Sequence, residues 1–343
     1  MNVNSAEQFV ELMQQTQSLP GLKSKADIHA IAEILVNSYP TEYPNGDDAA
    51  VLSNSNADNG YDLLAIEGFL PEFVSQDPWF AGWCAVMVNI SDITAMGGRP
   101  SAVVNAYWGG NDELAQQVFA GMSAASQAFQ LPIVGGHTNL NQADQPILAA
   151  AILGKAKRVL HSFSAKPGQQ LIAAIDLRGQ YRAPFNNWNA ATAAPAARVR
   201  NDLALLPMLA EQNLVHAAKD ISQAGVLGTT VMMMESAQVG AHVMLEKIPK
   251  PDQIEWLQWL NSFPSFGYLL TAEPHDTEDI LTAFQQRDIS AAVIGEINDS
   301  QRLTVSSETK HSTPFLFWDL KKNPLMGFGR VSESCFLKES ICA

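Results

Sequence analysis

Cysteine is scarce in this chain of 343 residues: only Cys84, Cys335 and Cys342 occur, far apart in the sequence. So few and so scattered thiols argue against a disulfide framework. Basic residues are also few, since 21 Lys and Arg stand against 35 Asp and Glu, giving a formal charge of −14. This balance, without any basic run, argues against nucleic acid or an anionic membrane as a partner.

Long apolar runs are absent as well. No segment approaches the roughly 20 apolar residues of a membrane-spanning helix. The first residues, MNVNSAEQFV, lack the basic start and the apolar centre of a signal peptide. We therefore expect a cytoplasmic protein. Its length and its hydrophobic content of 47% favour two domains with large cores.

Two polar residues in an otherwise apolar segment, 78–96, form the first candidate site. Asp77-Pro78 predicts the start of a helix and Gly97-Gly98 predicts its end. Apolar residues occur all round this helix, which predicts burial. Asn89 and Asp92 are three positions apart and share one face. A buried carboxylate needs a partner or a metal ion, and an Asp that only accepts hydrogen bonds is the alternative.

Adjacent carboxylates form a second candidate site near the start of the chain. Asp47 and Asp48 follow Gly46 and lead into a short apolar strand. Neighbouring side chains of a strand point to opposite faces, so both carboxylates meet one ion only where the backbone turns. Gly46, preceded by Pro44-Asn45, predicts such a turn. Oxygen ligands of this kind suit Mg²⁺, which usually joins one or two carboxylates to phosphates. A solvated turn is the alternative.

Two further segments place polar residues beside glycines. Gly135 and Gly136 follow a short apolar strand, and glycine lets a backbone approach a ligand closely. His137 and Thr138 come next and are candidates for contacting an ion or a phosphate. Gly-Gly turns after strands are common, which leaves a plain turn as the alternative. Asp220, before a glycine-bearing turn into a helix, is a candidate for another acidic ligand.

In this order and spacing, the four segments resemble a known superfamily, from about residue 46 to residue 298. GDDAAVL and GWCAVMVNISDITAMGGRP are similar to segments of thiamine-monophosphate kinase, and KDISQAGVLG resembles the family's Asp-x-Ser-Asp-Gly-Leu segment. The superfamily is PurM-like, related to aminoimidazole ribonucleotide (AIR) synthetase. It also contains selenophosphate synthetase and the hydrogenase maturation protein that dehydrates a carbamoyl group. No phosphate loop of the GxxxxGK[ST] type occurs, which agrees with a family that binds ATP without one.

The resemblance implies an α+β protein of two domains. The N-terminal domain would carry a mixed sheet and pair with its copy in a homodimer, and the C-terminal domain would be an α/β sandwich. The implied cofactors are ATP and Mg²⁺. The implied metal ligands are all carboxylates: Asp47, Asp48, Glu67, Asp92 and Asp220. The implied cofactor-binding residues are polar residues or glycines: Asn89, Gly135, Gly136, His137 and Thr138.

The chain departs from thiamine-monophosphate kinase at several of these positions. His137 and Gln223 stand where the kinase has Asp, and the segment 181–197, with Arg182, has no counterpart that we can place. A buried polar site rejects ligands that leave its groups unpaired, so such changes should alter specificity sharply. We therefore predict ATP- and Mg²⁺-dependent activation of a different small-molecule acceptor, contacted by Gln223 and Arg182. Catalytic residues stay unassigned.

Three other interpretations are open. The first is thiamine-monophosphate kinase itself, and the second is a non-catalytic ATP sensor or partner-binding protein. Selenophosphate synthetase is disfavoured, because that enzyme needs an N-terminal Cys or selenocysteine and no Cys precedes Cys84. The third is the hydrogenase maturation protein, whose reactive Cys lies at the C-terminus. Cys342 lies near the end here, but an Ala follows it and the family's preceding Pro-Arg is missing.

Hydrophobic periodicity and turn residues give the expected organisation. We expect a first domain over residues 1–160, a second over 166–305, and a C-terminal tail over 306–343. The segment 181–197 is expected to be a loop of low local order. Helices are expected at 5–18, 24–37, 78–96, 112–129 with Asn111 as its cap, 196–211, 223–238, 251–261 and 276–287. Strands are expected at 49–53, 62–67, 101–107, 131–135, 147–154, 170–175, 241–246, 266–272, 290–297 and 301–305.

Overall fold

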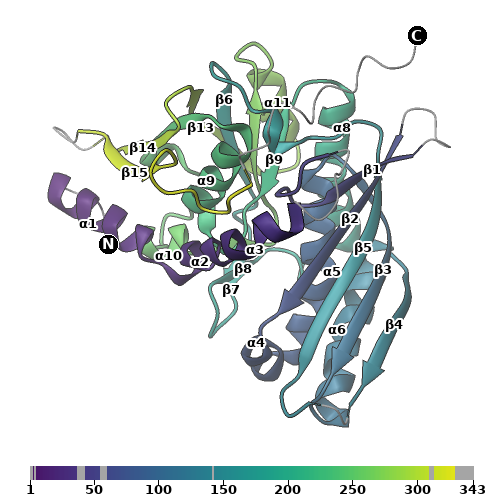
Figure 1. The fold of residues 1–343 in the computed structure, drawn as a ribbon. Helices are drawn as coiled ribbons and strands as arrows, with labels where there is room; N and C mark the ends of the chain where they lie inside the picture. The colour runs from purple at the N-terminus through teal and green to yellow at the C-terminus, as the bar shows by residue number, and fades with distance from the viewer. Residues whose placement is uncertain are drawn as a thin grey trace. The chain divides into compact units, whose positions relative to one another are not determined.

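The computed structural model describes residues 3, 5–36, 43–54, 60–140, 143–308 and 313–328. The chain divides into two compact units, each of which is discontinuous in sequence. One comprises Asp48–Leu160 and Ala191–Asn213, and the other comprises Met1–Asp47, His161–Ala190 and Leu214–Ala343. We call them the five-stranded unit and the seven-stranded unit after their main sheets (Figure 1).

The five-stranded unit is built on a mixed sheet in the order β1-β2-β5-β3-β4. Its strands are β1 (Ala50–Asn54), β2 (Gly60–Phe69), β3 (Arg99–Trp108), β4 (Ile133–Asn139) and β5 (Ile147–Ala156). All neighbours are antiparallel except β3 and β4, which are parallel. Buried and exposed residues alternate along β2, β3 and β5, so one face of the sheet is covered and the other is open.

The helices of this unit are α4 (Pro71–Gln76), α5 (Pro78–Ala95), α6 (Asp112–Phe129), α7 (Ala196–Leu203) and α8 (Leu205–Glu211). Helix α5 lies against the buried face of the sheet (Figure 1), and α4 also contacts β5. Helices α6 and α8 pack on α5, and α7 packs on α6. The predicted all-round burial of α5 is confirmed. Asn111 caps α6 as predicted, since its Oδ1 accepts a hydrogen bond from Leu114 N at 2.9 Å. Asp77 precedes α5 but makes no capping hydrogen bond, because α4 ends directly before it.

The seven-stranded unit contains the larger sheet, in the order β15-β14-β10-β13-β6-β12-β9. These strands are β6 (Gln170–Ile175), β9 (Ala217–Asp220), β10 (Gly240–Met244), β12 (Gly267–Ala272), β13 (Ser290–Asn298), β14 (Arg302–Ser306) and β15 (Phe315–Asp319). A small sheet of β7 (Gln180–Tyr181), β8 (Asn187–Asn189) and β11 (Phe263–Pro264) lies in the same unit. Only β10 and β14 are parallel neighbours in the larger sheet.

The helices of the seven-stranded unit come from both ends of its sequence. They are α1 (Ala6–Gln17), α2 (Pro20–Lys23), α3 (Ala26–Val36), α9 (Gly225–Ala237), α10 (Trp256–Leu260) and α11 (Thr277–Gln285), with short 3₁₀ turns η1 (Ser162–Ser164) and η2 (Leu245–Lys247). The methionines of α9 lie in the core, as the apolar pattern suggested. None of the helices among the described residues is long and apolar enough to cross a membrane.

The segment 181–197 is not the predicted loop of low order. It contains β8 and residues of β7 and α7, because Trp188 is buried and its Nε1 donates to Asp176 O at 2.9 Å. The predicted helix 196–211 is interrupted at Ala204, since Pro207 has no N–H to continue the helical ladder. Strands β9 and β15 were not predicted, and β9 places Lys219 on a strand of the larger sheet.

The two units differ in their boundaries from the predicted domains. Residues up to Asp47 belong to the seven-stranded unit, although the prediction placed them in the first domain. The described part of the predicted tail, 306–308 and 313–328, also belongs to that unit and contributes Phe317, Leu325 and Met326 to its core. Contacts between segments far apart in the sequence decide these assignments, and local periodicity does not report such contacts.

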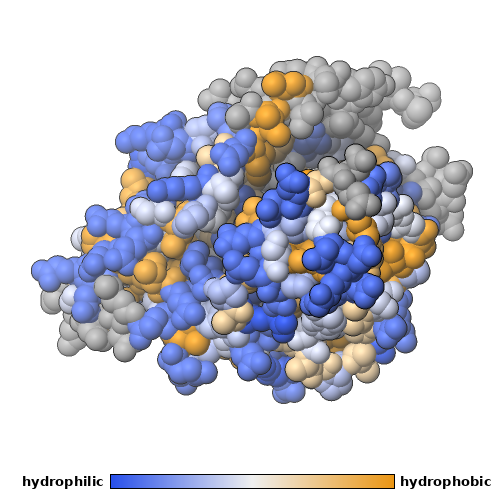
Figure 2. All heavy atoms as spheres, turned by 90° about the horizontal axis from the view of Figure 1, so that it is seen from below, coloured by the Kyte–Doolittle hydropathy of each residue, from blue (hydrophilic) through white to orange (hydrophobic). Residues whose placement is uncertain are grey.

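Most of the surface in the view of Figure 2 is hydrophilic, and hydrophobic residues form separate patches on it. The apolar residues of the chain are concentrated in the two buried layers described above. Several large apolar side chains are exposed, and a group of them lies on the open face of the five-stranded sheet. Its large exposed hydrophobic side chains, called the open sheet face below, are Leu52, Leu64, Ile66, Val104, Val134, Ile147 and Leu153.

Candidate functional site

The predicted site residues are divided between the two units, and the boundary falls between Asp47 and Asp48. The five-stranded unit holds Asp48, Glu67, Asn89, Asp92 and the segment 135–138. The seven-stranded unit holds Asp47, Arg182, Asp220 and Gln223.

Helix α5 carries the two polar residues that its sequence singled out. Asn89 is 0% exposed and Asp92 is 4% exposed. Asn89 Nδ2 donates to Ala85 O at 2.9 Å and to Ala150 O at 3.1 Å, so it joins the helix to β5. No hydrogen-bond partner of Asn89 Oδ1 lies among the described residues. A buried oxygen without a donor costs about 1–3 kcal/mol, which points to a cation or a donor that the chain alone does not supply.

One row of register partners crosses four strands next to this helix. Glu67 on β2 faces Ala150 on β5, Ala150 faces Asn105 on β3, and Asn105 faces Gly136 on β4. Register partners project from the same face of a sheet, and both Ala150 and Asn105 are buried on the helix side. Glu67 and Asn105 therefore flank Ala150, whose carbonyl accepts from Asn89. Glu67, predicted as a metal ligand, and Asn89, predicted to bind the cofactor, therefore both lie next to Ala150.

Asn105 was missed by the sequence prediction. It is buried, and within the described part of the chain its Nδ2 has no hydrogen-bond partner. A Cβ atom at position 136 would lie 2.1 Å from Asn105 Oδ1, so only glycine leaves room for this amide. The signal was available: Asn105 is a polar residue at a buried position of the alternating pattern in β3.

The segment 135–138 is not the turn that was the alternative, and the strand predicted over 131–135 extends further, to Asn139. Gly135, Gly136, His137 and Thr138 all lie within β4, the edge strand of the sheet, and are exposed. The strand continues because β4 pairs with β3 through Asn139. The His137 ring lies 5.3 Å from the Trp108 ring, centroid to centroid. These residues therefore form an exposed strand edge, whose backbone groups are available to a ligand or to another strand.

In the seven-stranded unit, Asp47 is enclosed by polar partners. Its Oδ2 accepts from Ser162 N at 2.7 Å, and its Oδ1 lies 3.4 Å from Lys219 Nζ. The ring of His161 stacks on Tyr43 with centroids 5.2 Å apart. Burial lowers the pKa of His161, and the nearby charge of Asp47 opposes this shift. Lys219 is the second residue of this site that sequence reasoning missed.

The remaining predicted residues lie on different elements of the seven-stranded unit. Asp220 ends β9 and faces Tyr268 on β12. Gln223 is exposed just before α9, and its backbone carbonyl packs against Gly21. Arg182 follows β7, where its backbone N–H donates to Asn187 O at 3.2 Å. The shared contact of Arg182 and Gln223 with an acceptor stays a prediction.

Among the described residues, which include all five predicted carboxylates, no group of three or more His, Cys, Asp or Glu could hold a metal ion. Mg²⁺ commonly keeps several waters and uses one or two carboxylates together with phosphates. Glu67 is the register partner of Ala150, which accepts a hydrogen bond from Asn89, and Asp92 lies one helical turn further along α5. An arrangement of few carboxylates with a neutral oxygen fits that mode. Asp47 differs from the other predicted carboxylates, since it is paired with the Lys219 ammonium and accepts a hydrogen bond from Ser162 N.

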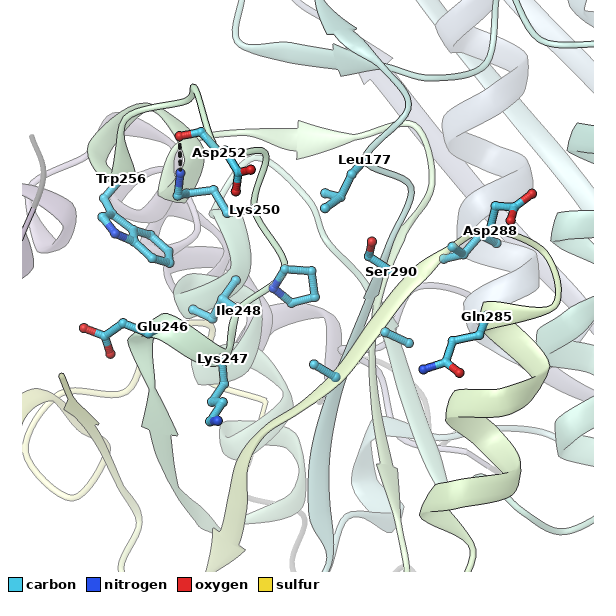
Figure 3. A pocket seen from close by; sticks show the side chains of 14 residues that line it. Leu177, Glu246, Lys247, Ile248, Lys250, Asp252, Trp256, Gln285, Asp288 and Ser290 are labelled. Carbon is cyan, nitrogen blue, oxygen red and sulfur yellow. Dashed lines mark hydrogen bonds between the residues drawn. The ribbon is translucent and has the colours of Figure 1, made fainter. Parts of the chain in front are cut away.

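An open groove of about 660 Å³ lies elsewhere in the seven-stranded unit (Figure 3). None of the predicted site residues lines it. Lys250 Nζ lies 5.3 Å from the Trp256 ring centroid and donates to the carbonyls of Pro251 and Ile254 at 2.8 and 2.6 Å. Burial lowers the pKa of Lys250. Because its ammonium is occupied by backbone carbonyls, this lysine secures the loop and is not available as an anion receptor.

The fold agrees with what known proteins show. The AIR synthase related protein N-terminal domain matches residues 46–156, and the C-terminal domain of the same family matches residues 182–308. Together the two matches cover more than half of the chain. The protein therefore belongs to the AIR synthase related family, and the predicted superfamily and two-domain α+β fold are confirmed.

Individual relatives span different parts of the chain. An uncharacterized protein of Synechocystis is 45% identical over 285 residues, 82% of this chain and 86% of the relative. Thiamine-monophosphate kinase of Pyrococcus abyssi is 36% identical over 137 residues, 38% of this chain and 43% of the kinase. PurL of T. maritima complexed with AMPPCP superposes with a TM-score of 0.70 at 17% identity, covering 88% of this chain. This chain spans only 50% of that PurL chain, and the likeness shows the fold.

Proposed function

We propose that the protein binds ATP with Mg²⁺ and transfers a phosphoryl group to a small-molecule acceptor other than thiamine monophosphate. The observation that carries the proposal is the buried polar row beside α5. Glu67 and Asn105 flank Ala150, and Asn89 Oδ1 lacks a partner among the described residues. A relative that is a kinase, and a structural relative bound to AMPPCP, support the nucleotide.

The residues have separate parts in this proposal. Asp92, Glu67 and Asp48 would hold Mg²⁺ through carboxylate oxygens, with Asn89 Oδ1 as a neutral oxygen ligand. When bound, Mg²⁺ neutralises the charge that develops on the transferred phosphoryl oxygens. Asn105 Nδ2 is a buried donor and would stabilise an anionic oxygen beside the row. His137 and Thr138 on the exposed edge strand would contact the phosphates.

A second candidate is a protein that binds ATP without transferring phosphate. It is favoured by His137 and Gln223, which stand where thiamine-monophosphate kinase is expected to carry aspartates. Replacing a carboxylate by imidazole weakens a Mg²⁺ site. A pool of cell metabolites, screened for ATP-dependent consumption, separates the two candidates: turnover of a fraction supports the kinase, and no turnover with any fraction supports the sensor.

The Asp92→Asn substitution is expected to weaken binding of MgATP by about tenfold or more, as loss of a metal-orienting group commonly does. The substitution keeps the size of the side chain and removes its charge. Calorimetry with and without magnesium measures the effect. Asp144→Asn, at an exposed loop position of the same unit, is the matched control and should bind as the parent does. Equal affinity of the Asp92 variant would make its carboxylate purely structural.

Thiamine monophosphate is expected not to be phosphorylated by the purified protein. Asp220 and Gln223 leave the second-domain segment with one carboxylate where the kinase has two, and polar sites discriminate strongly against mismatched ligands. A coupled assay for ADP release, run with thiamine monophosphate and with the metabolite pool, measures this. Efficient phosphorylation of thiamine monophosphate would restore the plain kinase assignment.

The open sheet face is expected to pair with its copy in a C2 dimer. Leu64 and Leu153 are register partners on it, and Ile66 is 71% exposed, so the face is apolar and continuous. Ile66→Asp should convert the dimer to a monomer in light scattering at micromolar concentration. Ile34→Asp, on α3 and 69% exposed, is the control and should leave the dimer intact. A monomeric parent that still binds ATP would remove the dimer from the mechanism.

A further inference from the structure

A buried ion pair links β9 to the segment before β1. Lys219 lies on β9 and Asp47 ends the first sequence segment of the same unit. Both side chains are 2% exposed, and Lys219 Nζ is 3.4 Å from Asp47 Oδ1. Ser162 N, at the start of η1, donates to the other carboxylate oxygen at 2.7 Å. The carboxylate is thus contacted on both oxygens from within one unit.

The charge balance of this pair conflicts with a metal at Asp47. Moving an ammonium or a carboxylate out of water costs several kcal/mol, and the cost is recovered only when an opposite charge lies close by. Lys219 and Asp47 satisfy this condition for one another. A divalent cation on Asp47 would stand next to the Lys219 ammonium, where the low dielectric strengthens the repulsion between like charges.

We propose that Lys219 is the permanent counter-ion of Asp47, and that Asp47 is a positioning residue and not a Mg²⁺ ligand in this chain. The resemblance to thiamine-monophosphate kinase implied the opposite for Asp47. In this chain the Lys219 ammonium neutralises the Asp47 carboxylate, so no bound metal ion is needed to balance that charge. Protein-bound Mg²⁺ is then left to the carboxylates of the five-stranded unit.

The proposed role of Asp47 is to hold neighbouring segments of the seven-stranded unit together. Its two contacts join three segments that are distant in sequence: the residues before β1, the turn η1 and strand β9. The next residue, Asp48, begins the five-stranded unit. Asp47, Asp48 and Ala49 lie in a bend, and Asp48 stays a candidate metal ligand.

The test uses four proteins: the parent, Lys219→Met, Asp47→Asn and the double variant Asp47→Asn/Lys219→Met. Each single variant removes one of the two paired charges and should unfold at a clearly lower urea concentration. The double variant removes both charges at similar volume, and should regain most of the parent's midpoint. Calorimetry with MgATP is then done on the double variant, with Asp92→Asn as the comparison.

The expected result is a strong coupling in the unfolding cycle and an affinity of the double variant for MgATP within about twofold of the parent. Two results would overturn the proposal. The first is a pair of single effects that simply add in the double variant. The second is a loss of MgATP affinity of about tenfold in a well-folded double variant, because removal of a metal-orienting group commonly causes a loss of that size. The unfolding cycle needs no nucleotide. A parent that does not bind MgATP therefore counts against the proposed function, while the cycle still decides whether Lys219 neutralises Asp47.

Discussion

Replacing Glu235 by glutamine is expected to lower the free energy of unfolding by about 3 kcal/mol, because several hydrogen bonds to a buried charge are weakened together. The Glu235 carboxylate on α9 is buried. It accepts from the backbone N–H groups of Leu325, Met326 and Gly327, at distances from 2.7 to 3.2 Å. An amide in its place keeps one acceptor oxygen and turns an NH₂ group toward backbone donors.

The geometry around Glu235 explains the size of the expected effect. Successive backbone N–H groups that converge on one anion form a nest, and Gly327 adopts the left-handed conformation, with φ of +82°, that such a turn uses. Leu325 and Met326 are also part of the hydrophobic core. The carboxylate therefore fixes the segment after β15 to the centre of the unit.

Urea unfolding followed by tryptophan fluorescence measures the effect of Glu235→Gln. Glu296→Gln on β13 is the matched control, because Glu296 is exposed and its substitution should change stability little. If the Glu235 variant unfolds at the parent's midpoint with an unchanged slope, the segment 325–327 is held by its apolar contacts alone.

Replacing Gly121 by alanine is expected to destabilise the five-stranded unit by about 3 kcal/mol, near the upper end of the usual range for overpacking. Helices α5 and α6 cross with their backbones in contact. A Cβ atom on Gly121 would lie 1.8 Å from Trp79 O, and one on Gly82 would lie 1.9 Å from Val118 O. Backbone atoms cannot rotate away, so the helices must separate along their buried faces.

This prediction opposes the intrinsic preference of a helix, in which alanine is more favourable than glycine by roughly 1 kcal/mol. Thermal unfolding of Gly121→Ala and Gly82→Ala measures the net effect. Gly68→Ala on β2 is the control, since nothing lies within 4 Å of the Cβ that it adds. An unfolding temperature of Gly121→Ala equal to that of the parent would mean that the two helices are less closely packed than described.

The sequence predicted best those features that depend on neighbouring residues. The cap of α6 by Asn111, the burial of α5 and the exact span of β6 follow from local patterns of polarity and capping. The predicted strand stopped at residue 135 and left Gly136 outside β4, because the role of this glycine depends on another strand. Gly136 is required by Asn105 on β3, a contact that no local pattern reports.

The candidate site divides in the same way. Glu67, Asn89 and Asp92 were predicted because each is a polar residue in an apolar setting, or matches a family motif. Lys219 was missed although its segment was singled out, because its partner Asp47 lies 172 positions earlier in the chain. Contacts across such a distance arise only when the sheet folds, and a single sequence that is not compared with others contains no signal for them.

The contact between α1 and β15 has a consequence for the synthesis of the protein. The Phe9 and Phe315 rings meet edge to face 6.5 Å apart, and Gln17 Nε2 donates to Phe317 O across a sequence separation of 300 residues. A ribosome adding about 5–20 residues per second needs about 15–60 s to make that interval. During this time the part of α1 that contacts β15 lacks that native partner, although α10, which α1 also contacts, is made earlier. The 12 residues of α1 are too few for a stable isolated helix. The packing of α1 is therefore completed only when β15 leaves the exit tunnel.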